Sequence, residues 1–76
     1  MNVIKCVYDG GYTVLFVWSD YFNAYIRETS DGCLGIRETE NGWESLRIMD
    51  NGDEDIASDL YDIPEEAGKY AIRYFS

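Results

Sequence analysis

Residues 12–18, Tyr-Thr-Val-Leu-Phe-Val-Trp, are the stretch that decides the fold. They are apolar at nearly every position and rich in β-branched and aromatic side chains, which is typical of a strand. The apolar part, residues 14–18, is far shorter than the ~20 residues that span a bilayer. We therefore expect a central strand that is covered on both faces.

Turn signals lie on both sides of this strand. Residues 3–8 precede it across Asp9-Gly10-Gly11, which predicts a hairpin. Three further turns follow: Ser30-Asp31-Gly32, Glu40-Asn41-Gly42 and Asn51-Gly52. The remaining strand-like segments are 33–38, 43–49 and 69–75. Turns spaced by ~10 residues are typical of an antiparallel sheet or a small barrel. The sequence thus predicts one β-rich domain, residues 1–76, with five to six strands.

Two segments have an ambiguous period. Residues 21–28 alternate as a strand does, but Ser19 is placed to cap a helix over 20–28, which would make the fold α+β. Residues 53–61 place Ile56 and Leu60 at helical spacing, and the acids at 53–55 suit the positive end of a helix dipole. We expect a strand at 21–28 and one short helix at 53–61.

The charge balance excludes several classes of function. The 76 residues include 15 acidic and 6 basic side chains and no histidine, for a net charge of −9. Direct binding to nucleic acid or to an anionic membrane depends on Lys and Arg, so neither is expected. A chain this short leaves room only for shallow cavities, and it offers no nucleophile paired with a base. The sequence predicts no enzyme, no catalytic residue and no cofactor.

The two cysteines, Cys6 and Cys33, do not have the spacing of a zinc or redox site. They are interpreted as free thiols of a reducing compartment, and a disulfide would require export. No apolar stretch of signal-peptide length begins the chain. A cytoplasmic location is therefore expected, which is the host cytoplasm if a phage encodes the protein.

The negative charge is concentrated in the second half of the chain. Residues 1–37 carry four acids and three bases, whereas residues 38–76 carry eleven acids and three bases. Residues 50–66 hold eight acids and no base: Asp50, Asp53, Glu54, Asp55, Asp59, Asp62, Glu65 and Glu66. Like charges held this close destabilise a folded chain by mutual repulsion, and a cationic partner would relieve that repulsion.

Three interpretations of residues 50–66 remain open: a solvated face, a surface that binds a basic protein, or a metal or catalytic site. No EF-hand register fits, so no metal site is predicted. A helical or extended conformation would place one charge every ~3 to ~7 Å, comparable to the ~3.4 Å between phosphates of a DNA strand. Tyr61, Tyr70 and Tyr74 are candidate interface anchors because tyrosine is enriched in binding hot spots. Glu38, Glu40 and Glu44 form a candidate second patch.

In size, charge and β-rich build the chain resembles the small acidic inhibitors of host defence that phages and mobile elements encode, such as anti-CRISPR proteins and DNA mimics. The likeness includes no sequence motif, so no residue is carried over from it. It implies an inhibitor that occupies the Lys- and Arg-lined site of a CRISPR effector, nuclease or restriction enzyme. The partner-binding residues would be the eight acids of residues 50–66 together with Tyr61.

Two alternatives to this function stay open. One is a homo-oligomeric structural or accessory protein, such as a virion component or a homodimer, that pairs through residues 69–75. The other is an antitoxin or immunity protein, which would neutralise a basic toxin by the same electrostatic attraction.

Overall fold

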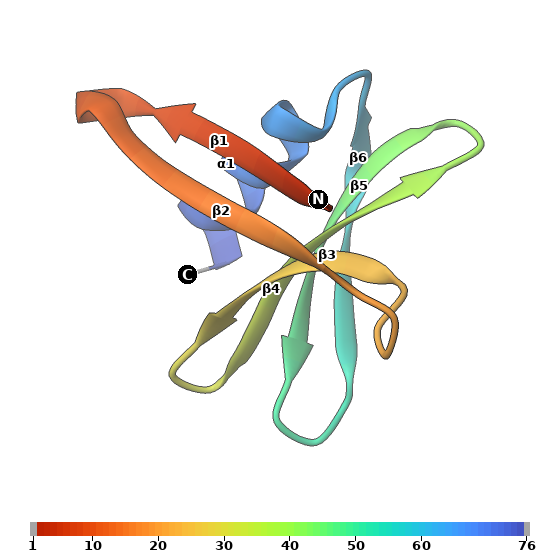
Figure 1. Cartoon of the computed structure of the whole chain (residues 1–76). Coiled ribbons are helices and arrows are strands. Elements are labelled where there is room, and N and C mark those ends of the chain that lie inside the picture. Colours follow the sequence, from red (N-terminus) through yellow and green to blue (C-terminus); the bar gives the residue numbers. More distant parts are fainter. Residues whose placement is uncertain (1, 76) are drawn as a thin grey trace.

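Six strands follow one another in sequence order in a single antiparallel sheet, and one helix follows the last strand (Figure 1). The computed structural model describes residues 2–75. The strands are β1 (Val3–Tyr8), β2 (Tyr12–Ser19), β3 (Ala24–Thr29), β4 (Gly32–Thr39), β5 (Gly42–Met49) and β6 (Glu54–Tyr61). A short 3₁₀ turn, Asp9–Gly11, joins β1 to β2, and the helix α1 is Pro64–Phe75. The prediction of a β-rich antiparallel sheet is therefore confirmed, with the sheet open rather than closed into a barrel.

Short hairpins set the register of the central strands. Thr29 pairs with Gly32 and Thr39 pairs with Gly42, so each turn has two residues. Gly32 has a φ of 151°, and a Cβ there would overlap the carbonyl oxygen of Ile48. Only glycine allows β4 to begin this close to β5, which explains why the turn carries glycine at that position.

The turn from β2 to β3 contains no helix, so the alternative helix at 20–28 is wrong. Ser19 Oγ accepts a hydrogen bond from the Phe22 backbone N–H at 3.3 Å, as a helix cap would. Asn23 then adopts a positive φ of 53°, which ends the turn, and β3 begins at Ala24. The polar side chain of Ser19 therefore stabilises one tight turn instead of starting a helix.

The predicted helix at 53–61 is also wrong, because these residues form strand β6. β6 pairs with β5 alone and is an edge strand, with Ile56 and Leu60 about half exposed. Three of its residues lie opposite Ser45, since Glu44 pairs with Leu60 and Leu46 pairs with Ile56. Ile56 and Leu60 thus flank the bulge at a distance of four residues, a spacing that also fits one face of a helix.

The helix lies instead at α1, where a final strand over residues 69–75 was expected. Pro64 stands at its first position, Glu65 and Glu66 lie in its first turn and Arg73 in its last. Each of these placements suits the helix end at which it occurs. The alternation of tyrosine and isoleucine in residues 69–75 resembles a strand, but the small residues Ala67, Gly68 and Ala71 form the buried stripe.

The main core lies between α1 and one face of the sheet. Phe16, Leu34 and Ile36 from the sheet are buried against Ala67 and Ala71 of the helix. Ser45 is also fully buried, and its hydroxyl donates a hydrogen bond to the Ala67 carbonyl oxygen at 2.7 Å. The small helical residues let the helix backbone approach the sheet closely.

The sheet curls around this helix. α1 packs against β1 at one end of the sheet and against β4, β5 and β6 at the other, which a flat sheet would not permit. The opposite face of the sheet buries Ala24, Leu46 and Ile48. The backbone carbonyls of Phe22 and Asn23 accept hydrogen bonds from Arg37, which is on that face, so the β2–β3 turn is held there.

The strand over residues 12–18 is covered on one face only, which corrects the expectation of two. Val14 and Phe16 point into the core, whereas Leu15 and Val17 are about half exposed on the other face.

Both cysteines are free thiols. Cys6 lies on the face of the sheet that packs against the core, and Cys33, the neighbour of the core residue Leu34 in β4, points to the opposite face. Within residues 2–75, no helix has the length and apolar character needed to cross a membrane.

Candidate protein-binding surface

The eight acids of residues 50–66 follow the free edge of the sheet. Asp50 and Asp53 lie in the turn between β5 and β6, and Asp62 follows the other end of β6 (Figure 1). The other five lie in β6 or in the first turn of α1: Glu54, Asp55, Asp59, Glu65 and Glu66. We call this set of eight residues the acidic edge.

The acidic edge is folded back at both ends and is therefore shorter than an extended chain. β6 has eight residues, which span about 26 Å at ~3.3 Å per residue. The longest dimension of the molecule is 32 Å, so a fully extended 17-residue run does not fit within it. The acids lie at both ends of β6 and within it. Their charges are therefore not spaced at a constant interval, as the phosphates of a DNA strand are.

Two members of the acidic edge are neutralised within the protein. Glu54 pairs with Arg37 at 3.3 Å, and Arg37 also pairs with Glu44 at the same distance. Asp55 pairs with Arg47 at 2.9 Å, and both of these side chains are largely exposed. These two acids fix the edge strand to the body of the sheet and are the least available to a partner.

The other six acids have no cationic partner among the described residues. No ion pair of residues 2–75 includes any of Asp50, Asp53, Asp59, Asp62, Glu65 or Glu66. Asp53 is held in its turn by Asn51, whose amide nitrogen donates to the Asp53 carboxylate at 3.1 Å. Glu65 is half-buried, and its charge raises the pKa of the neighbouring Cys6 thiol in addition to the larger effect of burial.

The proposed second patch does not form. Arg37 pairs with Glu44 and Glu38 pairs with Trp43 in the β4–β5 register, so Glu38 and Glu44 point to opposite faces of the sheet. Glu40 lies in the turn between these strands. The three residues are near one another in sequence but do not share a surface.

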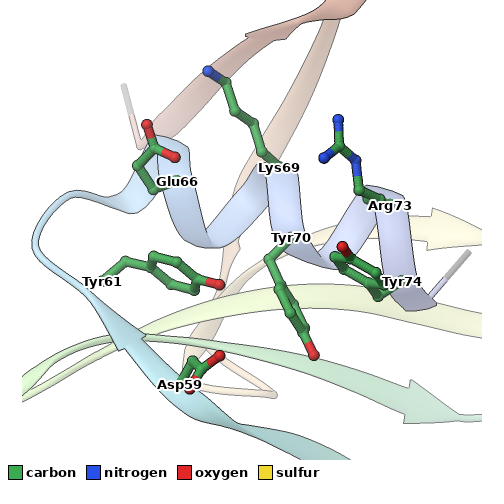
Figure 2. Close-up of a pocket in the computed structure, with 7 residues that line it drawn as sticks. All are labelled: Asp59, Tyr61, Glu66, Lys69, Tyr70, Arg73 and Tyr74. Carbon is green, nitrogen blue, oxygen red and sulfur yellow. The ribbon is translucent and has the colours of Figure 1, made fainter.

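A cleft opens where β6 meets α1, and it contains the three tyrosines that the sequence indicated as anchors (Figure 2). Its volume is about 500 Å³. Its lining consists of Asp59, Tyr61, Glu66, Lys69, Tyr70, Arg73 and Tyr74. The ring centroids of Tyr61 and Tyr70 are 6.1 Å apart, and those of Tyr70 and Tyr74 are 4.7 Å apart. We call this feature the tyrosine cleft.

The surroundings of Tyr61 in the tyrosine cleft disfavour a negative charge on its phenol. Burial raises the pKa of the Tyr61 phenol, and the charge of Asp59 raises it further, with smaller effects of Tyr70, Tyr74 and Glu66. A neutral phenol is thus favoured over a phenolate at this position. Asp59 and Tyr61 are two residues apart on β6, which brings both side chains to the face that looks toward α1.

The sequence indicates both the tyrosines and the acids as candidate binding residues, but it does not place them in one cleft. The sequence predicts a helix at residues 53–61 and a strand at residues 69–75, and this assignment does not bring the two segments into one cleft. The i to i+4 spacing of Glu66, Tyr70 and Tyr74 was the available signal, because it places them on one side of a helix.

Among the described residues, no group of three or more Cys, Asp and Glu side chains is arranged to hold a metal ion. Comparisons of the chain with protein-family models, with curated proteins and with solved structures give no match. The functional argument therefore depends on the acidic edge and on the tyrosine cleft.

Proposed function

We propose that this protein binds the Lys- and Arg-rich surface of a nucleic-acid-binding enzyme through its acidic edge, and so prevents nucleic acid from entering that site. An enzyme of the CRISPR effector, nuclease or restriction type has such a surface. The protein would act in the cytoplasm, where these enzymes meet their substrates. The eight acids and Tyr61 are the proposed partner-binding residues.

The observation that carries this proposal is the set of six carboxylates along and beside β6 that form no ion pair with a cation of the described residues. Because the net charge is −9, these groups repel one another in the unbound protein. A cationic surface would replace that repulsion by attraction. Such an encounter is accelerated by charge and weakened by salt, since exposed charges are screened beyond ~10 Å at moderate ionic strength.

The edge position of β6 supports the same proposal. Exposed strand edges of like charge resist pairing with another copy of the same chain. The charge on β6 thus disfavours self-association through this edge while leaving the edge open to a partner of opposite charge. Residues 69–75 lie in helix α1, so pairing of two copies through a strand at these residues would need an element that the structure does not have.

The test is a binding experiment with matched charge variants. The triple variant Asp59→Asn, Asp62→Asn, Glu66→Gln removes three negative charges from the acidic edge. The control triple variant Asp20→Asn, Glu28→Gln, Asp31→Asn removes the same charge from the region of β3 and its turns. In both variants every amide keeps an oxygen that accepts hydrogen bonds.

Immobilised wild-type protein is expected to retain a DNA-binding enzyme from bacterial lysate at low salt and to release it at high salt. The purified enzyme should lose binding to fluorescent DNA when the wild-type protein or the control variant is added, and should keep it with the acidic-edge variant. Equal inhibition by the two triple variants would reject the acidic edge as the binding surface. An enzyme that binds DNA unchanged beside the wild-type protein would reject the inhibitor function.

A further inference from the structure

The tyrosine cleft has the composition of a cation-binding site. Rings from two different elements meet there, with Tyr61 from β6 and with Tyr70 and Tyr74 from α1. The face of an aromatic ring attracts a cation within about 6 Å of its centroid. The centroid separations of 6.1 and 4.7 Å show that neighbouring rings contact one another, so a small planar group that lies across them can touch more than one ring.

The charged groups of the cleft are divided between two sides. Figure 2 shows Asp59 on the sheet side, beside the rings of Tyr61 and Tyr70. It also shows the side chains of Lys69 and Arg73 extending from the opposite side of α1, away from Asp59. A cation that enters among the rings would therefore meet a carboxylate, and would not directly face the two basic groups.

A guanidinium group fits this arrangement better than an ammonium group does. Guanidinium is planar, stacks on aromatic rings and offers several N–H donors, so it can lie on Tyr70 while it donates to Asp59. An ammonium group is compact and strongly hydrated, and it gains less from a ring face. The cleft also opens at the end of the acidic edge that contains Asp62 and Glu66, so a basic surface on that edge brings its side chains to the mouth of the cleft.

We propose that the tyrosine cleft binds the guanidinium group of one arginine side chain of the partner, which lies against the rings of Tyr61, Tyr70 and Tyr74 with Asp59 as its counter-charge. This inference rests on the proposed function and deepens it. The acidic edge supplies attraction that depends on charge alone, and the cleft supplies a preference for arginine over lysine.

Two peptides of equal charge test the proposal, nona-arginine and nona-lysine, with N-acetyl-arginine amide as a single-residue probe. Their dissociation constants are measured at low salt by fluorescence anisotropy or calorimetry, and the tyrosine ring resonances are followed by NMR. The variants are Tyr74→Leu and Asp59→Asn. Tyr21→Leu is the control, because Tyr21 is 88% exposed and lies in the β2–β3 turn, away from the cleft.

We expect nona-arginine to bind wild-type protein more tightly than nona-lysine and to shift the resonances of the three cleft tyrosines. Tyr74→Leu and Asp59→Asn should each weaken nona-arginine binding ~3- to 10-fold and reduce the preference for arginine, whereas Tyr21→Leu should change neither. Circular dichroism confirms that each variant is folded. Tyr74 is 63% exposed, so its replacement should leave the core intact.

The contrary results separate the two proposals. Equal binding of both peptides with unmoved tyrosine resonances overturns the arginine site but leaves the acidic edge as a binding surface. Absence of binding by either peptide overturns the proposed function together with the arginine site. Binding of the single arginine probe as tightly as nona-arginine would identify a small-molecule site and would overturn the assignment to a protein side chain.

Discussion

The backbone of Gly68 in α1 lies against the side chain of Cys6 in β1, so that a methyl group on Gly68 would overlap the Cys6 sulfur. The same methyl group would approach Cε1 of Phe16 to 3.2 Å. This contact joins the C-terminal helix to the first strand of the sheet. It also fixes the distance between helix and sheet at the centre of the core.

Gly68→Ala is expected to lower the free energy of unfolding by ~1 to 3 kcal/mol, because overpacking outweighs the gain of about 1 kcal/mol in helix propensity. Cys6→Ala removes the sulfur that the new methyl group would meet. The double variant Cys6→Ala, Gly68→Ala should therefore be more stable than the sum of the two single changes predicts. Urea denaturation of the four proteins measures this coupling, and additive effects would show that Gly68 is not limited by Cys6.

The Cys6 thiol makes stability sensitive to alkaline pH. Burial raises the pKa of the Cys6 thiol from 9.0 to about 11, with a further increase from Glu65 that Lys69 opposes. Because the folded-state pKa is the higher one, the contribution is complete below pH 9 and is lost as the pH rises to about 11. We expect wild-type protein to lose ~2 kcal/mol more than Cys6→Ala across that range. Identical pH profiles of the two proteins would contradict this prediction.

Arg37 connects three parts of the molecule through one side chain. It donates hydrogen bonds to the backbone carbonyls of Phe22 and Asn23 at 2.9 and 3.0 Å, and it pairs with Glu44 and Glu54. Lysine cannot reach all four groups, so Arg37→Lys should lower the free energy of unfolding by ~2 kcal/mol.

The matched control for Arg37 is Arg27→Lys, since Arg27 is an exposed arginine of the neighbouring strand β3. Its effect on the free energy of unfolding should stay within ~0.5 kcal/mol. Amide hydrogen exchange at residues 20–24 should rise in Arg37→Lys and not in Arg27→Lys. Equal stability of the two variants would show that the four contacts of Arg37 contribute little.

Neutralising different parts of the acidic edge should change stability in opposite directions. Asp59→Asn with Asp62→Asn removes repulsion, and it should stabilise the fold by a few tenths of a kcal/mol at low salt and by less at high salt. Glu54→Gln with Asp55→Asn breaks the pairs with Arg37 and Arg47 and should destabilise the fold by ~0.5 to 1 kcal/mol. Thermal denaturation at two salt concentrations distinguishes them, and the same sign for both pairs would contradict the division of the edge into paired and unpaired acids.

The first five strands could be predicted from sequence because glycine marks the turn on at least one side of each. The turn before β3 contains no glycine, and β3 begins at Ala24 instead of the predicted residue 21. Residues 3–8 were predicted to the residue, and the glycines at positions 32 and 42 indicated the two-residue hairpins. The inward direction of Leu34 and Ile36 followed from alternation, and both are buried. Strong local signals of this kind need no knowledge of the rest of the chain.

β6 and α1 could not be assigned in this way because tertiary contacts decide their structure. β6 is an exposed edge strand with a bulge, so it has no apolar face that would reveal a period of two. α1 buries alanine and glycine, whose small side chains give a weak apolar signal, while its large aromatic residues lie at the surface or its rim. An isolated pattern therefore favours the wrong element for both segments.

The candidate site was predicted in composition but not in arrangement. The concentration of acids in residues 50–66 is visible in the sequence, and so is the proximity of three tyrosines to it. Glu54 and Asp55 are paired internally with Arg37 and Arg47. The register brings Arg47 opposite Asp55, whereas Arg37 reaches Glu54 from β4, on the far side of β5. The presence of Asp59 and Tyr70 in one cleft likewise requires a helix that packs against β6.

The order of the strands has a consequence for how the chain folds. Each strand pairs with the next along the sequence, so the sheet can grow hairpin by hairpin while the polypeptide emerges from the ribosome. The helix comes last, yet it touches the first strand and the last three. Formation of α1 is thus the step that completes the core, and a chain without α1 would leave Phe16 and Ile36 facing water.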